Sequence, residues 1–500
     1  MLSKRGIALF GARALAGAVG LTVVVVGLGA AAIVPWPTVE TAPASVVVSP
    51  TPGEQQRVCP GPLLTLAEDS TQAQAVSSVG SADAVYAAHA AVSGADASEQ
   101  GWADPDVSPL AAPDNAKGDA DGAPLLLRVP VEAGVSVASL VSGSQSETAA
   151  GETLGGLAVA ACAEAAGDSW LVGGSTDIGR TSLVLLSNPT TVTATVDLTV
   201  FGETGQVDAP GSTGILVQPG SQRIVSLAGL APNLRSPVVH VQSRGGQVTA
   251  DLQQSIVRGI APGGVDLIGA SSGPGRTQTI AGLLITAAAP EAAPTEAGGL
   301  PDGVPSVRVL VPGKQPATVE VGVTSADGST PGTSVQVEIQ PGITTEVPLT
   351  GLAPGMYSAA LVSDQPLVAA AQSSTAGDAG RDFAWFTASG TLDDEFLVSV
   401  VTGPAPILVL VNTGRSAATY TVSPRTGTPT TGTPTMGTPT TVSVAAGRTA
   451  TLPLTAAGSY LVSGGSSTVA SVTYAGDGLM ASFPLSQAGP LAAPIRVYPH

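Results

Sequence analysis

The segment Ala194-Thr-Val-Asp-Leu-Thr-Val200 decides the fold, because apolar and polar residues alternate along it. Alternate side chains of a β-strand point to opposite faces, so every second residue from Ala194 to Val200 shares one apolar face. The intervening Thr195, Asp197 and Thr199 share the other face. The pattern predicts a strand that has one face in an apolar core and the other in water.

Similar segments rich in Val, Leu, Ile and Thr recur from Trp170 to the C-terminus. Turns rich in Gly, Pro and Asn separate them at intervals of roughly 8–12 residues, which is typical of β-sandwiches and barrels. We therefore expect an all-β fold.

The segments form three copies of one pattern, which run from Ser182 to Gln254, from Ser306 to Gln372 and from Pro406 to Val472. Each copy has a turn glycine at the same place, and these are Gly220, Gly342 and Gly447. An interval of about 110 residues with about seven strands suggests tandem immunoglobulin-like β-sandwich modules. The strand order stays open at this point.

The sequence predicts a cytoplasmic stub with a transmembrane signal anchor (1–37), a spacer (38–56), an Ala/Ser/Gly-rich β region with a partly disordered insert (57–175) and three β-sandwiches (176–275, 276–378 and 379–500). In the insert, residues 67–123 have few large apolar side chains, and the segment Val85 to Val92 is compatible with a short helix. The last sandwich contains a Thr/Pro repeat loop at residues 426–440. We expect this loop to be disordered, either bare or with O-linked sugars.

The N-terminal sequence indicates export. Basic residues precede an uncharged apolar run, residues 14–34, which is long enough for a helix to cross a hydrocarbon core of about 30 Å. No basic residue follows before Arg57, so the positive-inside rule places the N-terminus in the cytoplasm and the bulk outside. A cleaved signal peptide that ends near Ala30 and Ala32 is the alternative. We expect a single-pass protein of the cytoplasmic membrane.

The net charge and the cysteine content indicate which partners and which covalent bonds to expect. The net charge is −18 with only 19 Lys and Arg residues, which argues against nucleic acid as a partner. The chain has two cysteines, Cys59 and Cys162, and in an exported protein such a pair predicts one disulfide. Two unrelated buried thiols are the alternative.

Several motifs resemble an uncharacterised family of membrane-anchored extracellular proteins of high-GC Gram-positive bacteria. They lie within residues 57–490 and are Val58-Cys59-Pro60-Gly61-Pro62, Cys162 followed by Ser169-Trp170-Leu-Val-Gly-Gly174, Leu185-Leu-Ser-Asn-Pro189, and Val248-Thr-Ala-Asp-Leu252 with Pro262-Gly-Gly264. The resemblance implies a shared fold and topology. It implies no activity and no catalytic residue, and the Thr/Pro insertion is specific to this chain.

The sequence contains no recognisable catalytic or cofactor motif. Its histidines, His89, His240 and His500, are far apart, so we expect no metal site and no cofactor. Gly269-Ala-Ser-Ser-Gly273 matches the nucleophile elbow, but Pro274 prevents the helix that the elbow requires.

Trp170 and Trp385 occupy similar places, ahead of the first and third copies. Exposed, these rings would stack on sugars; buried, they would belong to the sandwich cores. Paired carboxylates remain a possible route to glycoside hydrolysis, and those that flank the two tryptophan segments are Asp168, Asp382, Asp393, Asp394 and Glu395.

These observations predict a structural or interaction protein of the cell envelope rather than an enzyme. The expected partners are the membrane, through residues 14–34, and a cell-wall polymer or another envelope protein. The alternative is a binding module for cell-wall polysaccharide or peptidoglycan, and glycoside hydrolysis is the third hypothesis.

Overall fold

The computed structural model describes residues 17–19, 46–48, 53–66, 76–90, 101–117, 122–131, 138–287, 300, 303–328, 330–375, 382–426, 435–486 and 495–497. It divides into two compact units, of which one is Met1–Pro50 with Ala493–His500 and the other is Thr51–Ala492. In the first unit, β1 (Val46–Val48) pairs antiparallel with β36 (Ile495–Val497), and residues 17–19 are helical. Among the described residues no helix has the length and apolarity to cross a membrane. Most of the expected anchor, residues 14–34, lies outside them.

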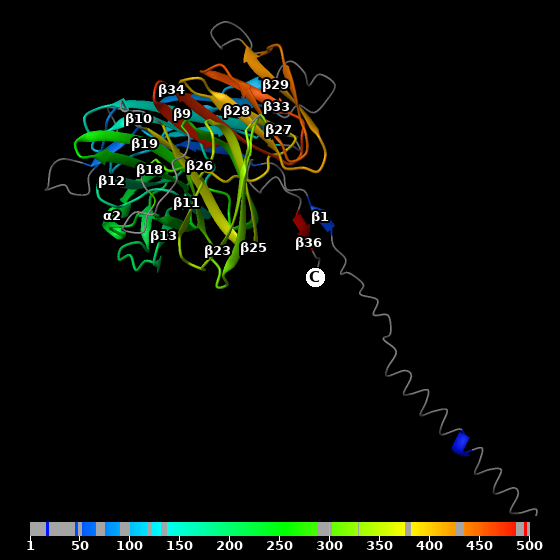
Figure 1. Cartoon of the computed structure of the whole chain (residues 1–500). Helices are drawn as coiled ribbons and strands as arrows, with labels where there is room; N and C mark the ends of the chain where they lie inside the picture. Colours follow the sequence, from blue (N-terminus) through cyan, green and yellow to red (C-terminus); the bar gives the residue numbers. More distant parts are fainter. Residues whose placement is uncertain are drawn as a thin grey trace, which may run out of the picture. The chain divides into compact units, whose positions relative to one another are not determined.

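The second unit is built almost entirely of antiparallel strands, with one short helix, α2 (Leu227–Leu230), in its described part (Figure 1). Its strands form four consecutive modules of paired sheets. The first, which we call the N-terminal module, contains β2 (Gln55–Cys59), β3 (Leu64–Leu66), β4 (Val76–Ser78), β5 (Asp83–His89), β6 (Trp102–Ala103), β7 (Asp106–Pro109), β8 (Leu125–Val129), β9 (Leu140–Ala150) and β10 (Gly155–Ala161). The predicted helix at Val85 to Val92 is therefore wrong over its described part, because β5 pairs with β9.

Modules two, three and four follow the N-terminal module along the chain. Module two contains β11 (Asp168–Val172), β12 (Arg180–Asn188), β13 (Ala194–Gly202), β14 (Gly205–Gln206), β15 (Ile215–Val217), β16 (Ser221–Ser226), β17 (Val238–Gly245), β18 (Thr249–Arg258) and β19 (Ala261–Gly269). Module three contains β20 (Gly275–Ile285), β21 (Ser306–Leu310), β22 (Ala317–Ser325), β23 (Thr333–Ile339), β24 (Thr345–Pro348), β25 (Gly355–Ser374) and β26 (Phe383–Thr387). Module four contains β27 (Glu395–Val400), β28 (Ile407–Asn412), β29 (Ala418–Thr426), β30 (Thr435–Met436), β31 (Thr440–Val444), β32 (Thr449–Pro453), β33 (Gly458–Ser463), β34 (Thr468–Gly476) and β35 (Leu479–Pro484).

The modules share one strand order. In module two, one sheet has the order β11-β17-β13-β15 and the other has the order β16-β12-β18-β19. Modules three and four repeat both orders with their corresponding strands, and β25 is long enough to serve both sheets of module three. The first strand of an immunoglobulin domain lies beside the second, whereas here β11 lies beside β17 and β12 is in the other sheet. The strand order is therefore not that of an immunoglobulin domain.

The N-terminal module has the same plan, although no repeat was predicted there. Its sheet β6-β5-β9-β10 matches β16-β12-β18-β19, and β2-β8-β7 takes the place of the other sheet. Strands β4 to β7 lie within residues 67–123, so the described part of this stretch is folded. Residues 67–75, 91–100 and 118–121 are outside the described part, as are residues 427–434 of the Thr/Pro loop.

Two module boundaries in the structure differ from the predicted ones. Residues 168–172 form β11, which pairs with β17 of module two rather than with the region before it. Residues 383–387 form β26, which pairs with β25 of module three rather than opening module four. Strand pairing decides membership, and the sequence pattern shows strands without showing their partners.

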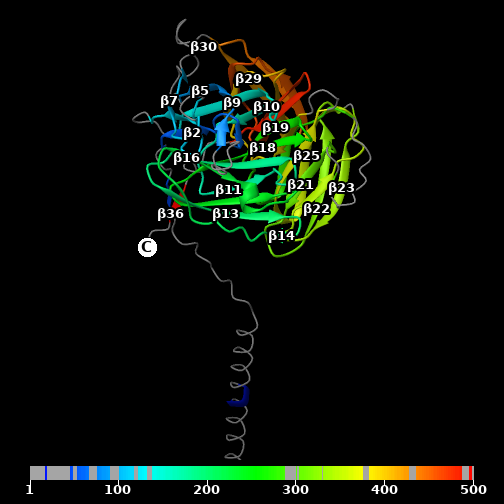
Figure 2. The same cartoon turned by 90° about the vertical axis from the view of Figure 1, so that its left-hand side faces the viewer.

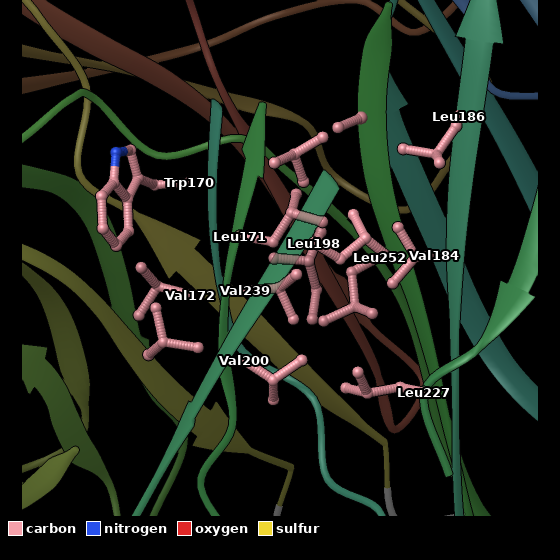
Figure 3. Close-up of a cluster of buried hydrophobic side chains, with 14 of the residues drawn as sticks. Trp170, Leu171, Val172, Val184, Leu186, Leu198, Val200, Leu227, Val239 and Leu252 are labelled. Carbon is pink, nitrogen blue, oxygen red and sulfur yellow. The ribbon is translucent and has the colours of Figure 1, made fainter. Parts of the chain in front are cut away.

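A dense apolar core lies between the sheets of module two (Figure 3). The alternation predicted from Ala194 to Val200 is confirmed, since Val196, Leu198 and Val200 are buried and Asp197 is more exposed. Strand β12 differs, because Val184 and Leu186 belong to this core while Leu183 and Leu185 belong to a second cluster with residues of β10. Both faces of β12 are thus buried, which explains its uninterrupted apolar run.

The last strands of the modules pack against one another. β10 lies against β19, as the two views show (Figure 1, Figure 2). β19 also lies against β26, β26 against β35, and β35 against β10, so that the four strands form a closed cycle. No hydrogen-bonded ladder joins these strands within the described residues. Side-chain contacts therefore link the modules along these strands, and just beyond the ends of β19 and β26 the N–H of Ser272 donates to the carbonyl oxygen of Ala388.

Candidate functional site

The junction of the four modules is organised by one carboxylate. Asp382, which immediately precedes β26, accepts backbone N–H groups from Leu157 of β10 at 2.9 Å, from Met480 of β35 at 3.1 Å and from Val265 of β19 at 3.3 Å. The side chain is 1% exposed. A single aspartate therefore contacts a strand from each of the other three modules.

Asp266 of β19 lies at the same junction and is completely buried. Its carboxylate accepts the N–H of Trp385 at 2.7 Å and that of Leu267 at 2.9 Å. Burial raises the pKa of Asp266 well above its usual range, and the nearby charge of Asp382 raises it further, against the effect of these two donors. Burial likewise raises the pKa of Asp382 to about 7, opposed by its backbone donors.

Asp266 and Asp382 are close enough for the charge of one to raise the pKa of the other, so they can be compared with the paired acids considered from the sequence. Glycosidases place their two carboxyl groups where a sugar ring and water can reach them. Both aspartates here are at most 1% exposed, and backbone donors occupy oxygens of each. The two carboxyl groups therefore connect strands of different modules through hydrogen bonds to their backbones.

Trp170 and Trp385 are both buried, at 5% and 2% exposure. The Trp170 ring stacks on His240 with centroids 3.9 Å apart. The indole N–H of Trp385 donates to Gln254 at 2.7 Å, and the guanidinium of Arg308 lies 4.5 Å above the ring. Both rings therefore belong to the cores of the sandwiches. Neither ring has an exposed face on which a sugar could stack.

Among the described residues, His240 and Asp168 form the only histidine–carboxylate pair within hydrogen-bonding distance. His240 Nε2 lies 2.8 Å from Asp168 Oδ2, and Asp168 is mostly exposed while His240 is not. The His240 side chain is only partly exposed, because the Trp170 ring covers its ring. A triad needs a hydroxyl or thiol beside the imidazole, and the contacts of His240 in the structure are to Asp168 and Trp170.

The other candidates are separated from these groups. Asp393, Asp394 and Glu395 are exposed at the start of β27. Ser271 is buried and its hydroxyl donates to the carbonyl oxygens of Ala369 and Ala388, so it is engaged between strands. Among the described residues no three His, Cys, Asp or Glu side chains gather as a metal site would require.

The predicted disulfide between Cys59 and Cys162 is confirmed. It joins the end of β2 to the residue after β10, across 103 residues of sequence, and both cysteines are buried beside Leu127. The bridge therefore ties the first and last strands of the N-terminal module.

The sequence did not single out Asp251, Asp266, Gln253 or Arg308. Gln253 donates to the carbonyl of Leu64 at 2.7 Å and accepts its N–H at 2.9 Å, which joins module two to the N-terminal module. Arg308 of module three donates to the carbonyl oxygens of Gly174 and Pro237 in module two. The one signal in the sequence was that each is a polar residue inside a strand, and the structure buries the residues on both faces of these strands.

Fold and candidate site together define an all-β, disulfide-bonded protein whose polar residues connect modules. The chain belongs to the family of unknown function DUF5719, whose model matches residues 115–455. No curated protein matches. One solved structure that matches is described as the crystal structure of Thermotoga maritima 1070, with 14% identity, 23% of this chain and 91% of that chain covered, and a TM-score of 0.19.

Proposed function

We propose that this protein is a membrane-anchored, extracytoplasmic component of the cell envelope with a structural or interaction role. The observation that carries the proposal is the buried disulfide between Cys59 and Cys162. Disulfides persist in oxidising compartments and are rare in the cytosol of most organisms. Its location inside the N-terminal module supports a chain that folds after export.

The membrane part of the proposal rests on residues 14–34 and on the charge asymmetry around them. In this proposal the segment is a single transmembrane helix, and tandem β-sandwich modules lie outside. The acidic body, with a net charge of −18 for the whole chain, would stay soluble and away from anionic lipid headgroups.

We further infer that the outer region works by binding rather than by catalysis. Asp266 and Asp382, two carboxyl groups whose pKa values burial raises, accept hydrogen bonds from backbone and are closed off from solvent. Perturbed pKa values also arise in structural networks, and burial is the main cause here. Trp170 and Trp385 are buried too, which favours a protein partner over stacking on a wall polysaccharide.

Protease treatment of intact, wall-stripped cells tests the location. The outer modules should be degraded while a cytoplasmic control survives, and thiol labelling of the unreduced, denatured protein should find no free cysteine. Survival of the chain while an external control is digested would contradict the proposed topology. Affinity capture with the full chain against membrane extract and against purified cell wall then separates a protein partner from a wall polymer.

A further inference from the structure

The outer edges of the modules differ in how well they are protected. An edge strand presents unpaired N–H and C=O groups, and proteins usually guard it by shortness, by proline or by a covering segment. On the sheet edge formed by β16, Ala111 of the N-terminal module provides cover through hydrogen bonds with Gly220 and Gln222. In the other sheet of each module, one edge is formed by β7, β15, β23 or β31, respectively.

Of these four strands, β23 is the longest, with 7 residues against 4 in β7, 3 in β15 and 5 in β31. β7 also ends in Pro109, whereas β23 contains no proline. Within the described residues β23 ends its sheet, and only β22 pairs with it. β23 is therefore the least protected edge of the group.

The two faces of β23 have different chemistry. Ser334, Gln336 and Glu338 are exposed on the outer face, while Val335 and Val337 point to the core of module three and remain only partly buried. A strand added beside β23 would cover the open flanks of both valines. It would also satisfy the free backbone groups of the edge.

We propose that β23 pairs antiparallel with β23 of a second copy of this chain, about a two-fold axis at Gln336. This register uses the whole strand and places Gln336 opposite its own counterpart. Val335 then faces Val337 of the second copy, and Glu338 faces Ser334. No two carboxylates oppose each other directly, and a symmetric dimer formed by one self-complementary patch is the commonest kind of oligomer.

The register makes two neighbouring lysine substitutions act in opposite directions. Gln336→Lys would place two ammonium groups face to face across the axis, so the dimer should dissociate at roughly tenfold higher concentration. Ser334→Lys would place a lysine opposite Glu338 at two symmetric positions, so the dimer should tighten by roughly 3- to 30-fold. Both side chains are exposed in the single chain, so neither change should disturb its fold.

Sedimentation of the full-length chain in detergent, over a concentration series, measures both effects. Thr318→Lys is the matched control, because Thr318 is exposed on the same face of β22 but lies one strand away from the axis. It should leave the dimer unchanged. A mass equal to one chain at every concentration would overturn the proposal, as would a dimer that responds alike to all three lysines.

Cysteine cross-linking tests the axis itself. Gln336→Cys should give a covalent dimer with a short bis-maleimide, since directly opposed Cβ atoms are about 5 Å apart. Ser334→Cys should cross-link far less, because the two copies of residue 334 lie four residues apart along the paired strands, about 13 Å. The other cysteines are already in a disulfide and do not interfere. Equal cross-linking at both positions, or none at Gln336→Cys, would overturn the register.

Discussion

The N-terminal module and module two have corresponding sheets but are stabilised in different ways. In module two, a large apolar cluster fills the space between the sheets, with members such as Leu171, Leu198 and Leu252. In the N-terminal module the equivalent clusters are small, one of Val58, Leu110 and Leu126 and another around the disulfide. The same topology is thus reached with and without a large core.

Inside the N-terminal module, polar contacts and one covalent bond supplement these small clusters, and Leu63 and Leu64 are buried in a further apolar cluster shared with module two. Gln145 accepts the N–H of Gly61 at 2.9 Å and donates to its carbonyl at 2.6 Å, and Glu147 accepts the N–H of Leu63 at 2.7 Å. Arg57, buried in β2, pairs with Glu164 at 3.1 Å. Buried groups of this kind stabilise only when every partner is present, whereas apolar contacts tolerate small losses. The comparison predicts that the N-terminal module is the more fragile of the two.

The largest effect is expected from the disulfide. Replacing Cys59 and Cys162 together by Ala removes a bridge that closes 103 residues, which in the chain-entropy model costs about 5 kcal/mol. Denaturant unfolding of the variant can be monitored by pulsed proteolysis, with cleavage assigned to each module. The N-terminal module should unfold at a lower denaturant concentration than module two. Simultaneous opening of both modules with an unchanged midpoint would contradict the comparison.

Asp251 lies on the same face of β18 as Gln253. Its titration should change the free energy of unfolding by up to about 4 kcal/mol as the pH changes. Burial raises its pKa to about 7, from 3.8 in the unfolded chain. The folded state therefore holds a proton that the unfolded state releases, so stability falls as pH rises from about 4 to 7. Asp251→Asn should remove this loss. Equal slopes of unfolding free energy against pH in both proteins would refute it.

The next effect tests the core of module two. Leu252→Ala removes a completely buried side chain and should lower the free energy of unfolding by about 3 kcal/mol. Leu216→Ala on β15 is the matched control, because Leu216 is 54% exposed, and it should change stability by less than about 0.5 kcal/mol. Similar losses at both positions would mean that the core does not carry the stability of this module.

The sequence predicts features that depend on neighbouring residues better than features that depend on distant ones. The alternation from Ala194 to Val200 is local, so it identified a strand and its buried face correctly. The pairing of β11 with β17 and of β26 with β25 depends on distant partners, so the boundaries predicted after residues 175 and 378 were misplaced. The repeat in the N-terminal module was not detected because its strands, such as β9 and β10, are rich in Ala, Gly and Ser and show little hydrophobic periodicity.

The candidate site shows the same division. The cysteine count, together with the expectation of export, was enough to predict the disulfide between Cys59 and Cys162. The roles of Asp266 and Asp382 depend on strands from several modules meeting at one point, and no spacing in the sequence encodes that meeting. Asp382 was singled out only because it precedes a tryptophan segment.

The smallest effect concerns the joint between the two compared modules. Gln253→Ala removes both hydrogen bonds to the backbone of Leu64 and leaves those buried groups without that partner, which should cost about 2 kcal/mol. Gln242→Ala, at an exposed amide on β17, is the control and should be nearly neutral. Hydrogen exchange gives the sharper readout, because loss of the joint should speed exchange at Leu64 while Leu252 in the core of module two stays protected. If Leu64 keeps its protection, the N-terminal module is held by the disulfide and its own contacts, and the polar joint contributes little.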